Sequence, residues 1–164
     1  VVGYEDFAYR PLSRVGELVE NVPGVIATQH SGTGKANQYF LRGFNLDHGT
    51  DFAGFVDGVP INLRTHGHGQ GYLDFNFVIP ELVARIDFRK GPYSVEAGDF
   101  SAAGSVNFKT VDRLDRPFAR VDVGEFGFYR AVGAGSFAAM GGDILVGVDG
   151  TLSNGVWELD ENLE

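Results

Sequence analysis

The sequence predicts an α+β domain with a small mixed sheet over residues 1–110, followed over residues 111–164 by antiparallel strands. Two observations favour this division. The first part combines one amphipathic helical segment with several short runs of β-branched and aromatic residues. The second part alternates apolar and other residues over long neighbouring segments joined by short connections. Of the 164 residues 24 are glycine, roughly twice the usual share, but they keep no three-residue period and so exclude a collagen-like chain.

Composition excludes several classes of protein. A hydrophobic content of 43% is enough for a core and excludes intrinsic disorder. The formal charge of −9 argues against nucleic acid as a partner, because phosphate contacts need a basic face. No stretch is apolar enough for a membrane-spanning helix, and the lack of cysteine excludes disulfides and thiolate metal sites. The chain opens without a Met or a signal-peptide pattern, so we expect an internal piece of a longer protein.

Residues 13–61 supply the first elements of the expected domain. A helix is predicted over residues 13–22, with an apolar face of Val15, Leu18, Val19 and Val22. Strands are predicted over residues 25–29 and 38–44, with a polar glycine loop between them. An Asp-Gly pair at 57–58 between apolar flanks predicts a hairpin, and the proline at position 60 places its second strand at an edge.

The remaining elements of this part follow a long loop. Residues 62–76 are rich in glycine and histidine and predict a loop. A short helical turn over residues 80–84 leads into a strand over residues 85–89, and residues 104–110 form another strand. These elements complete one small domain.

Residues 111–164 have two interpretations. The alternation fits half-buried strands of a soluble sandwich or the first strands of a transmembrane β-barrel. Tyr129 and Phe137 would lie ~26 Å apart along one strand. With the usual strand tilt, this spacing places two aromatic side chains near the two edges of a membrane's apolar layer.

Three sequence motifs typical of enzymes are incomplete or missing in this chain. The run at 32–36 lacks the first glycine and the final Ser or Thr of a phosphate-binding loop. The run at 67–72 has Tyr72 where a dinucleotide fingerprint needs its third glycine. No Gly-x-Ser-x-Gly sequence occurs. These glycines are interpreted as turn and close-packing residues.

Histidines in two loops are the residues whose chemistry suggests a site. His48 lies between Asp47 and Asp51, and His66 and His68 precede Tyr72 and Asp74. Neutral imidazole and carboxylate suit borderline divalent metals such as zinc. The metal candidates are therefore His48, His66 and His68. The alternatives are solvent-exposed polar loop residues, contact with some other substrate, or a hydrolytic metal site.

Five motifs resemble, in order and spacing, the plug domain of TonB-dependent outer-membrane receptors. They are LVENVPGV at 18–25, LRGF at 41–44, VDGVP at 56–60, ELVARIDFRKGP at 81–92 and GDFSAAGSVNFKT at 98–110. The resemblance covers about residues 12–110. The alternating strands that follow fit the first barrel strands of that family.

The resemblance implies the fold and function of a transporter fragment. Residues 1–110 would be the plug, held inside a barrel of about 22 strands, and residues 111–164 a truncated start of that barrel. The implied activity is energy-coupled import of a scarce nutrient, most often an iron–siderophore or another metal chelate, across the outer membrane of a Gram-negative cell. The implied partners are the TonB protein, through a segment upstream of Val1, the missing barrel strands, outer-membrane lipid and the chelate. No enzyme activity and no cofactor are expected.

The resemblance also assigns two groups of residues. Arg42 would pair with a barrel carboxylate, and Lys90, where the family usually has arginine, would do so only as a point charge. The loops after the Arg-Gly-Phe strand and the Asp-Gly hairpin would face the extracellular side and touch substrate. The expected contacts are Asp47, His48, His66, His68, Tyr72 and Asp74. Direct transition-metal uptake, a stand-alone metal-binding module and a metal-dependent enzyme remain the alternatives.

Overall fold

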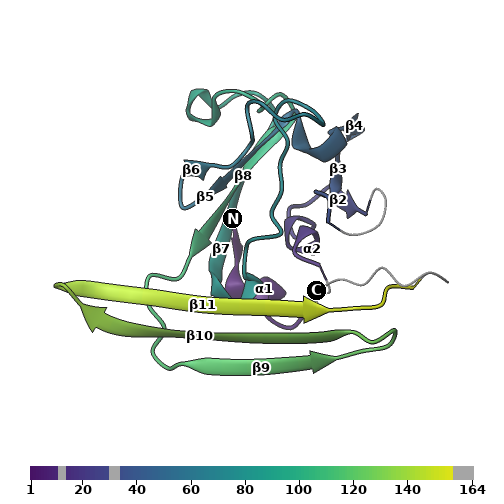
Figure 1. The fold of residues 1–164 in the computed structure, drawn as a ribbon. Helices are drawn as coiled ribbons and strands as arrows, with labels where there is room; N and C mark the ends of the chain where they lie inside the picture. Colours follow the sequence, from purple (N-terminus) through teal and green to yellow (C-terminus); the bar gives the residue numbers. More distant parts are fainter. Residues whose placement is uncertain (11–13, 30–33, 157–164) are drawn as a thin grey trace. The chain divides into compact units, whose positions relative to one another are not determined.

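A computed structural model describes residues 1–10, 14–29 and 34–156. The chain divides into two compact units, Val1–Thr110 and Val111–Glu164. Each unit is described by itself below, with its elements labelled as in Figure 1.

The main sheet of the first unit has five strands in the order β1-β7-β8-β5-β6 (Figure 1). The strands are β1 Val2–Gly3, β5 Phe52–Val56, β6 Val59–Pro60, β7 Val83–Lys90 and β8 Gly104–Thr110. β5 and β8 run parallel and the other pairs run antiparallel. The predicted mixed sheet is therefore confirmed, and β6, which contains Pro60, lies at its edge as expected.

The hairpin between β5 and β6 is tied to β8 through Asp57. The Asp57 carboxylate accepts hydrogen bonds from Lys109 Nζ at 2.8 Å, the Thr110 amide at 3.1 Å and the Thr110 hydroxyl at 2.5 Å. Partial burial by itself raises the pKa of Asp57, but these hydrogen bonds outweigh it and lower the pKa below its usual range.

A second sheet of the first unit has the order β2-β3-β4, with strands Val25–Thr28, Gln38–Leu41 and Phe44–Asn45. The prediction of one strand over residues 38–44 is wrong at its end. Arg42 and Gly43 have φ of 52° and 86° and form a two-residue turn, so Leu41 pairs with Phe44. Two positive φ angles match the twist of paired strands, and Gly43 adopts one of them without strain.

The helices of the first unit are short. They are the α-helices α1 Tyr4–Phe7 and α2 Gly16–Val19 and the 3₁₀ turns η1 Asp47–Gly49, η2 Pro80–Leu82 and η3 Val95–Ala97. The helix predicted over residues 13–22 is thus only one turn long in the described part, and position 13, where it is expected to begin, lies outside the described residues. Its expected apolar face is largely confirmed, because Leu18, Val19 and Val22 are buried. None of the helices in the described part of the chain is long and apolar enough to cross a membrane.

A cluster of buried hydrophobic residues forms the core of the first unit. Its buried residues are Phe7, Leu18, Val19, Val22, Val25, Ala27, Tyr39, Leu41, Leu46, Phe52, Leu73, Phe75, Val78, Val83, Ile86, Ala103, Val106 and Phe108. Leu73 brings the long loop into this core. It packs so tightly against Gly49 that a Cβ at position 49 would lie 2.3 Å from Leu73 Cβ, and Gly49 also has a positive φ of 95°. Only glycine fits there.

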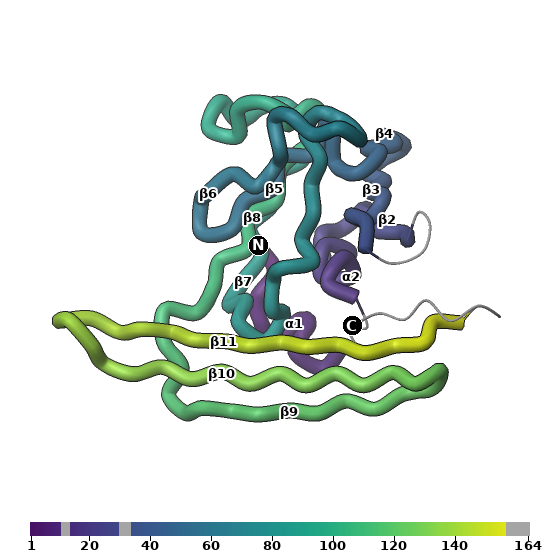
Figure 2. Tube along the Cα trace, viewed as in Figure 1, coloured from purple at the N-terminus to yellow at the C-terminus, as the bar shows by residue number. Residues whose placement is uncertain are grey.

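The second unit is an antiparallel sheet in the order β11-β10-β9, with strands Phe118–Val123, Tyr129–Ala139 and Gly142–Leu152 for β9, β10 and β11. Figure 2 shows these strands as neighbouring tubes. The register places directly paired residues on the same face. One face consists only of apolar residues and glycine: Ala119, Val121, Val123, Tyr129, Ala131, Gly133, Gly135, Phe137, Ile144, Val146, Val148, Gly150 and Leu152.

The other face of the second unit carries charge. Arg130 forms ion pairs with Asp122, at 3.6 Å, and with Asp149. Arg120 forms an ion pair with Asp122 at 2.8 Å. The alternation in the sequence therefore corresponds to a sheet with one wholly apolar face and one charged face.

Candidate functional site

His48 lies in η1, in a backbone conformation that is rare for a residue with a side chain. Its φ is 64°, and that of Asp47 is 29°. His48 is buried, and its Nδ1 lies 2.8 Å from the carbonyl oxygen of Ala36. Because a carbonyl only accepts, Nδ1 carries the hydrogen in the neutral ring and Nε2 presents a lone pair. Nε2 lies 3.9 Å from Asp47 Oδ1.

Tyr72 brings the histidines of the long loop to His48. The Tyr72 ring stacks on His66 with centroids 4.2 Å apart, and its centroid is 5.9 Å from that of His68 and 5.5 Å from that of His48. The His48 and His68 centroids are 4.7 Å apart, edge to face. The structure thus gathers His48, His66, His68 and Tyr72, which are called the imidazole cluster below.

Ala36 joins a third loop to the imidazole cluster through its backbone. Its amide donates to the Tyr72 hydroxyl at 2.7 Å, and its carbonyl accepts from His48. The segments around residues 36, 48 and 72 are therefore held together by hydrogen bonds as well as by ring contacts. Within the long loop, an antiparallel β-bridge also pairs Leu63 with Tyr72.

Asn62 organises the base of the long loop. Its Oδ1 accepts from the Gly54 amide at 2.7 Å. Its Nδ2 donates toward the carbonyls of Gly71 at 2.9 Å, Phe52 at 3.0 Å and Gly49 at 3.3 Å. Sequence reasoning missed Asn62, because an asparagine in a polar loop gives no periodic or motif signal.

The two aspartates are peripheral to the imidazole cluster. The side chain of Asp47 is 66% exposed. Asp74 Oδ1 accepts from the Asn76 amide at 2.8 Å and so closes its own turn. Within the described ranges 1–10, 14–29 and 34–156, no group of three or more His, Asp or Glu side chains is arranged to hold a metal ion. The predicted metal candidates therefore meet as aromatic rings and not as a three-donor site.

A second tyrosine near this region stays neutral. Tyr39 is fully buried and packs against Phe52 and Phe75, each with centroids 6.1 Å away. Burial, followed by the charge of Asp74 and the proximity of Tyr72, raises the pKa of Tyr39 far above its usual range. Its hydroxyl therefore does not supply a phenolate ligand at physiological pH.

Arg42 and Lys90, the expected contacts to a barrel, lie apart from the imidazole cluster. Arg42 is exposed at the turn between β3 and β4. Lys90 Nζ lies 5.6 Å from the centroid of the Phe88 ring. Neither side chain forms an ion pair with another residue in the part of the chain that the structure describes.

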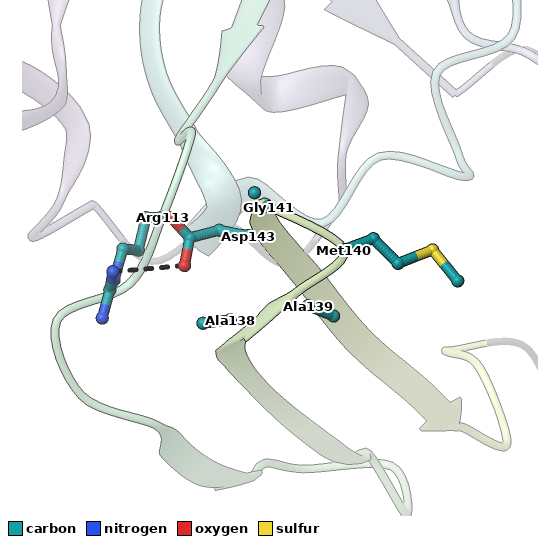
Figure 3. Close-up of a pocket in the computed structure, with 7 residues that line it drawn as sticks. Arg113, Ala138, Ala139, Met140, Gly141 and Asp143 are labelled. Carbon is teal, nitrogen blue, oxygen red and sulfur yellow. Dashed lines mark ion pairs between the residues drawn. The ribbon is translucent and has the colours of Figure 1, made fainter.

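In the described part of the chain, cavities also occur outside the imidazole cluster, and two are considered. One, of about 520 Å³, surrounds the β10–β11 turn, where Arg113 pairs with Asp143 at 3.1 Å and Met140 points outward (Figure 3). The other, of about 490 Å³, lies in the first unit and contains Arg89 and Glu96, 3.6 Å apart. Each contains an exposed ion pair, and neither includes a residue of the imidazole cluster.

Comparison with known proteins identifies the family. The family model of the TonB-dependent receptor plug domain matches residues 1–105. The chain therefore belongs to this family, as the five motifs predicted. It is a family of receptors and not of enzymes.

Solved structures show the same fold at low sequence identity. The siderophore receptor PirA from Pseudomonas aeruginosa matches with a TM-score of 0.65 and 22% identity, over 98% of this chain and 29% of its own. The copper transporter OprC matches with a TM-score of 0.67 and 18% identity, over 93% of this chain and 23% of its own. A mutant of the ferric enterobactin receptor PfeA from Pseudomonas aeruginosa has a TM-score of 0.57 and 23% identity, over 81% of this chain. This chain spans 21% of the length of that receptor.

Proposed function

We propose that the chain is the plug and the first barrel strands of an outer-membrane receptor that imports a metal chelate by TonB-dependent, energy-coupled transport. Residues 1–110 are the plug and residues 111–164 the truncated start of the barrel. The match of the plug family to residues 1–105 carries this proposal. The two-faced sheet of β9, β10 and β11 supports it, because barrel strands need an apolar face toward lipid and tolerate charge toward the lumen.

The proposed partners follow from the same assignment. Outer-membrane lipid covers the apolar face that includes Val121, Tyr129 and Phe137. The missing strands complete the barrel and offer carboxylates to Arg42 and Lys90. The TonB protein binds a segment that precedes Val1. The location is the outer membrane of a Gram-negative cell.

The imidazole cluster supports a chelate as cargo more than a bare ion. A bare divalent ion needs about four protein ligands in a closed site, and the described residues offer no group of even three. Among the proteins with this fold are two named as a siderophore receptor and a ferric enterobactin receptor.

Direct uptake of a transition metal is the second candidate. It is favoured by the gathering of His48, His66 and His68 within one cluster. OprC, which shares the fold, is named as a copper transporter. Barrel loops outside this chain would then have to complete the coordination.

Metal accumulation in cells tests the proposed function. Cells of the source organism with the receptor gene deleted, and cells lacking TonB, are grown under metal limitation beside the wild type, and iron, copper, nickel and zinc are measured by mass spectrometry. We expect the same metal to fall in both mutants and to return when the receptor gene is restored. Equal contents of all four metals in the three strains under each limitation would contradict the proposal.

A further inference from the structure

We propose that the Asp57–Gly58 turn between β5 and β6 is a latent site of isoaspartate formation, which the folded protein keeps from reacting. The protection comes from three residues of β8, namely Asn107, Lys109 and Thr110. This inference concerns a spontaneous covalent modification of the first unit, and it does not depend on what the receptor imports.

An Asp-Gly pair rearranges readily because glycine leaves the amide that follows the aspartate unhindered. The Gly58 nitrogen attacks Asp57 Cγ and gives its proton to solvent, while the carboxylic-acid hydroxyl takes up a proton and leaves Cγ as water. A second water molecule then opens the five-membered succinimide ring. When it breaks the bond between the Gly58 nitrogen and the main-chain carbonyl carbon of Asp57, the product is isoaspartate, whose chain runs through Cγ.

The nucleophile of this reaction is held by Asn107. The Gly58 amide donates a hydrogen bond to Asn107 Oδ1 at 2.9 Å, so its proton is already bound. Asn107 pairs with Phe55 of β5 and with Asp87 of β7, which fixes its position within the sheet. The attack on Asp57 therefore requires a hydrogen bond to break first.

The electrophile is held by Lys109 and Thr110. Asp57 Oδ1 accepts from Lys109 Nζ at 2.8 Å and from the Thr110 amide at 3.1 Å, and Oδ2 accepts from the Thr110 hydroxyl at 2.5 Å. These donors favour the ionised carboxylate, which is unreactive because it has no hydroxyl to lose as water. They also oppose the side-chain rotation that would bring Cγ onto the Gly58 nitrogen.

The turn meets the other requirements of the reaction. Asp57 and Gly58 are exposed, so water reaches both of them. Isoaspartate inserts an extra backbone carbon between the paired residues Val56 and Val59, which no longer fits a two-residue turn. Its free carboxylate is bonded directly to Cα and is therefore one carbon shorter than the aspartate side chain. The rearrangement thus releases the hairpin from β8.

The test ages the full-length receptor in detergent for weeks at mildly acidic pH, beside a sample unfolded in guanidinium chloride. Isoaspartate at position 57 is measured in tryptic peptides by electron-transfer fragmentation. We expect the unfolded wild type to form it at least about 10-fold faster than the folded wild type, because all the protecting hydrogen bonds are lost. Deamidation at Asn154–Gly155, the Asn-Gly pair of the chain, verifies that each sample has aged.

Two variants remove one protecting group each. Asn107→Ala removes the acceptor of the Gly58 amide, and Thr110→Val removes the hydroxyl donor but keeps a β-branched side chain. Each should raise the folded rate by about 5-fold, the effect of one lost hydrogen bond, while hydrogen exchange in β7 shows that the sheet stays folded. Ser105→Ala, on the same face of β8 as Asn107, is the matched control and should age like the wild type. Equal rates in the folded and unfolded wild type, or a rate that neither variant raises, would overturn the inference.

Discussion

Replacing Asn62 by alanine should detach the long loop from the sheet of the first unit. Three of the Asn62 hydrogen bonds are 3.0 Å or shorter, to Gly54, Gly71 and Phe52. A net contribution of about 1 kcal/mol for each predicts a loss of about 3 kcal/mol in the free energy of unfolding. The fourth contact, at 3.3 Å, adds little.

Urea unfolding of a fragment of residues 1–110, followed by circular dichroism, measures this loss. The fragment contains every buried residue of the first unit's hydrophobic core, so we expect it to fold. With a denaturant slope of about 1.5 kcal/mol per M, the midpoint should fall by roughly 2 M. Asn76→Ala is the control, because Asn76 is exposed and, among the described residues, its side chain donates one long hydrogen bond, of 3.4 Å.

The control should change stability by less than about 0.5 kcal/mol. If Asn62→Ala were as mild as Asn76→Ala, the loop would be held by Leu73 packing and ring contacts alone. The reasoning that assigns Asn62 the organising role would then be refuted.

Three further predictions concern other parts of the chain. Because the pKa of Asp57 is lower in the folded protein than in the unfolded chain, its carboxylate stabilises the fold above the unfolded pKa of about 4. This stabilisation is lost as the pH falls through the folded pKa. Between pH 7 and pH 3 the urea midpoint of the 1–110 fragment should therefore fall more than that of its Asp57→Asn variant. An equal fall of the two midpoints over this pH range would contradict the prediction. The 1–110 fragment should be soluble, whereas 1–164, with its apolar face and open strand edges, should aggregate or need detergent; light scattering showing both as monomers would count against the barrel assignment. In the full-length receptor, Arg42→Ala should remove one partner of a buried ion pair and reduce the stability of the plug by roughly 3–5 kcal/mol. Faster hydrogen exchange in the plug sheet would report this loss, whereas unchanged exchange would show that Arg42 is a solvated residue.

Local pattern predicted most elements because their signals are short-range. The Asp-Gly hairpin and its edge proline, the helical turn at Pro80 and the strand at 104–110 are all confirmed. The long antiparallel strands with short connections expected over residues 111–164 are present as well, with β10 and β11 paired along their whole length. The error at residues 38–44 arose because an apolar run of this length does not show where the chain reverses direction. In the structure, the pairing of Leu41 with Phe44 places the reversal between these two residues.

For the candidate site, the sequence determined which residues take part, and the tertiary structure determined which of them lie together. The sequence by itself identified the histidines, Tyr72 and the two loops that carry them, since residue chemistry is visible in any chain. It could not show that His48 and His68 meet, because glycine-rich loops leave the direction of a side chain open. Hydrogen bonds between segments distant in sequence, from Ala36 to Tyr72 and from Asn62 to β5 and Gly71, determine that meeting. Such contacts depend on where the sheet places each loop end, which only the folded structure decides.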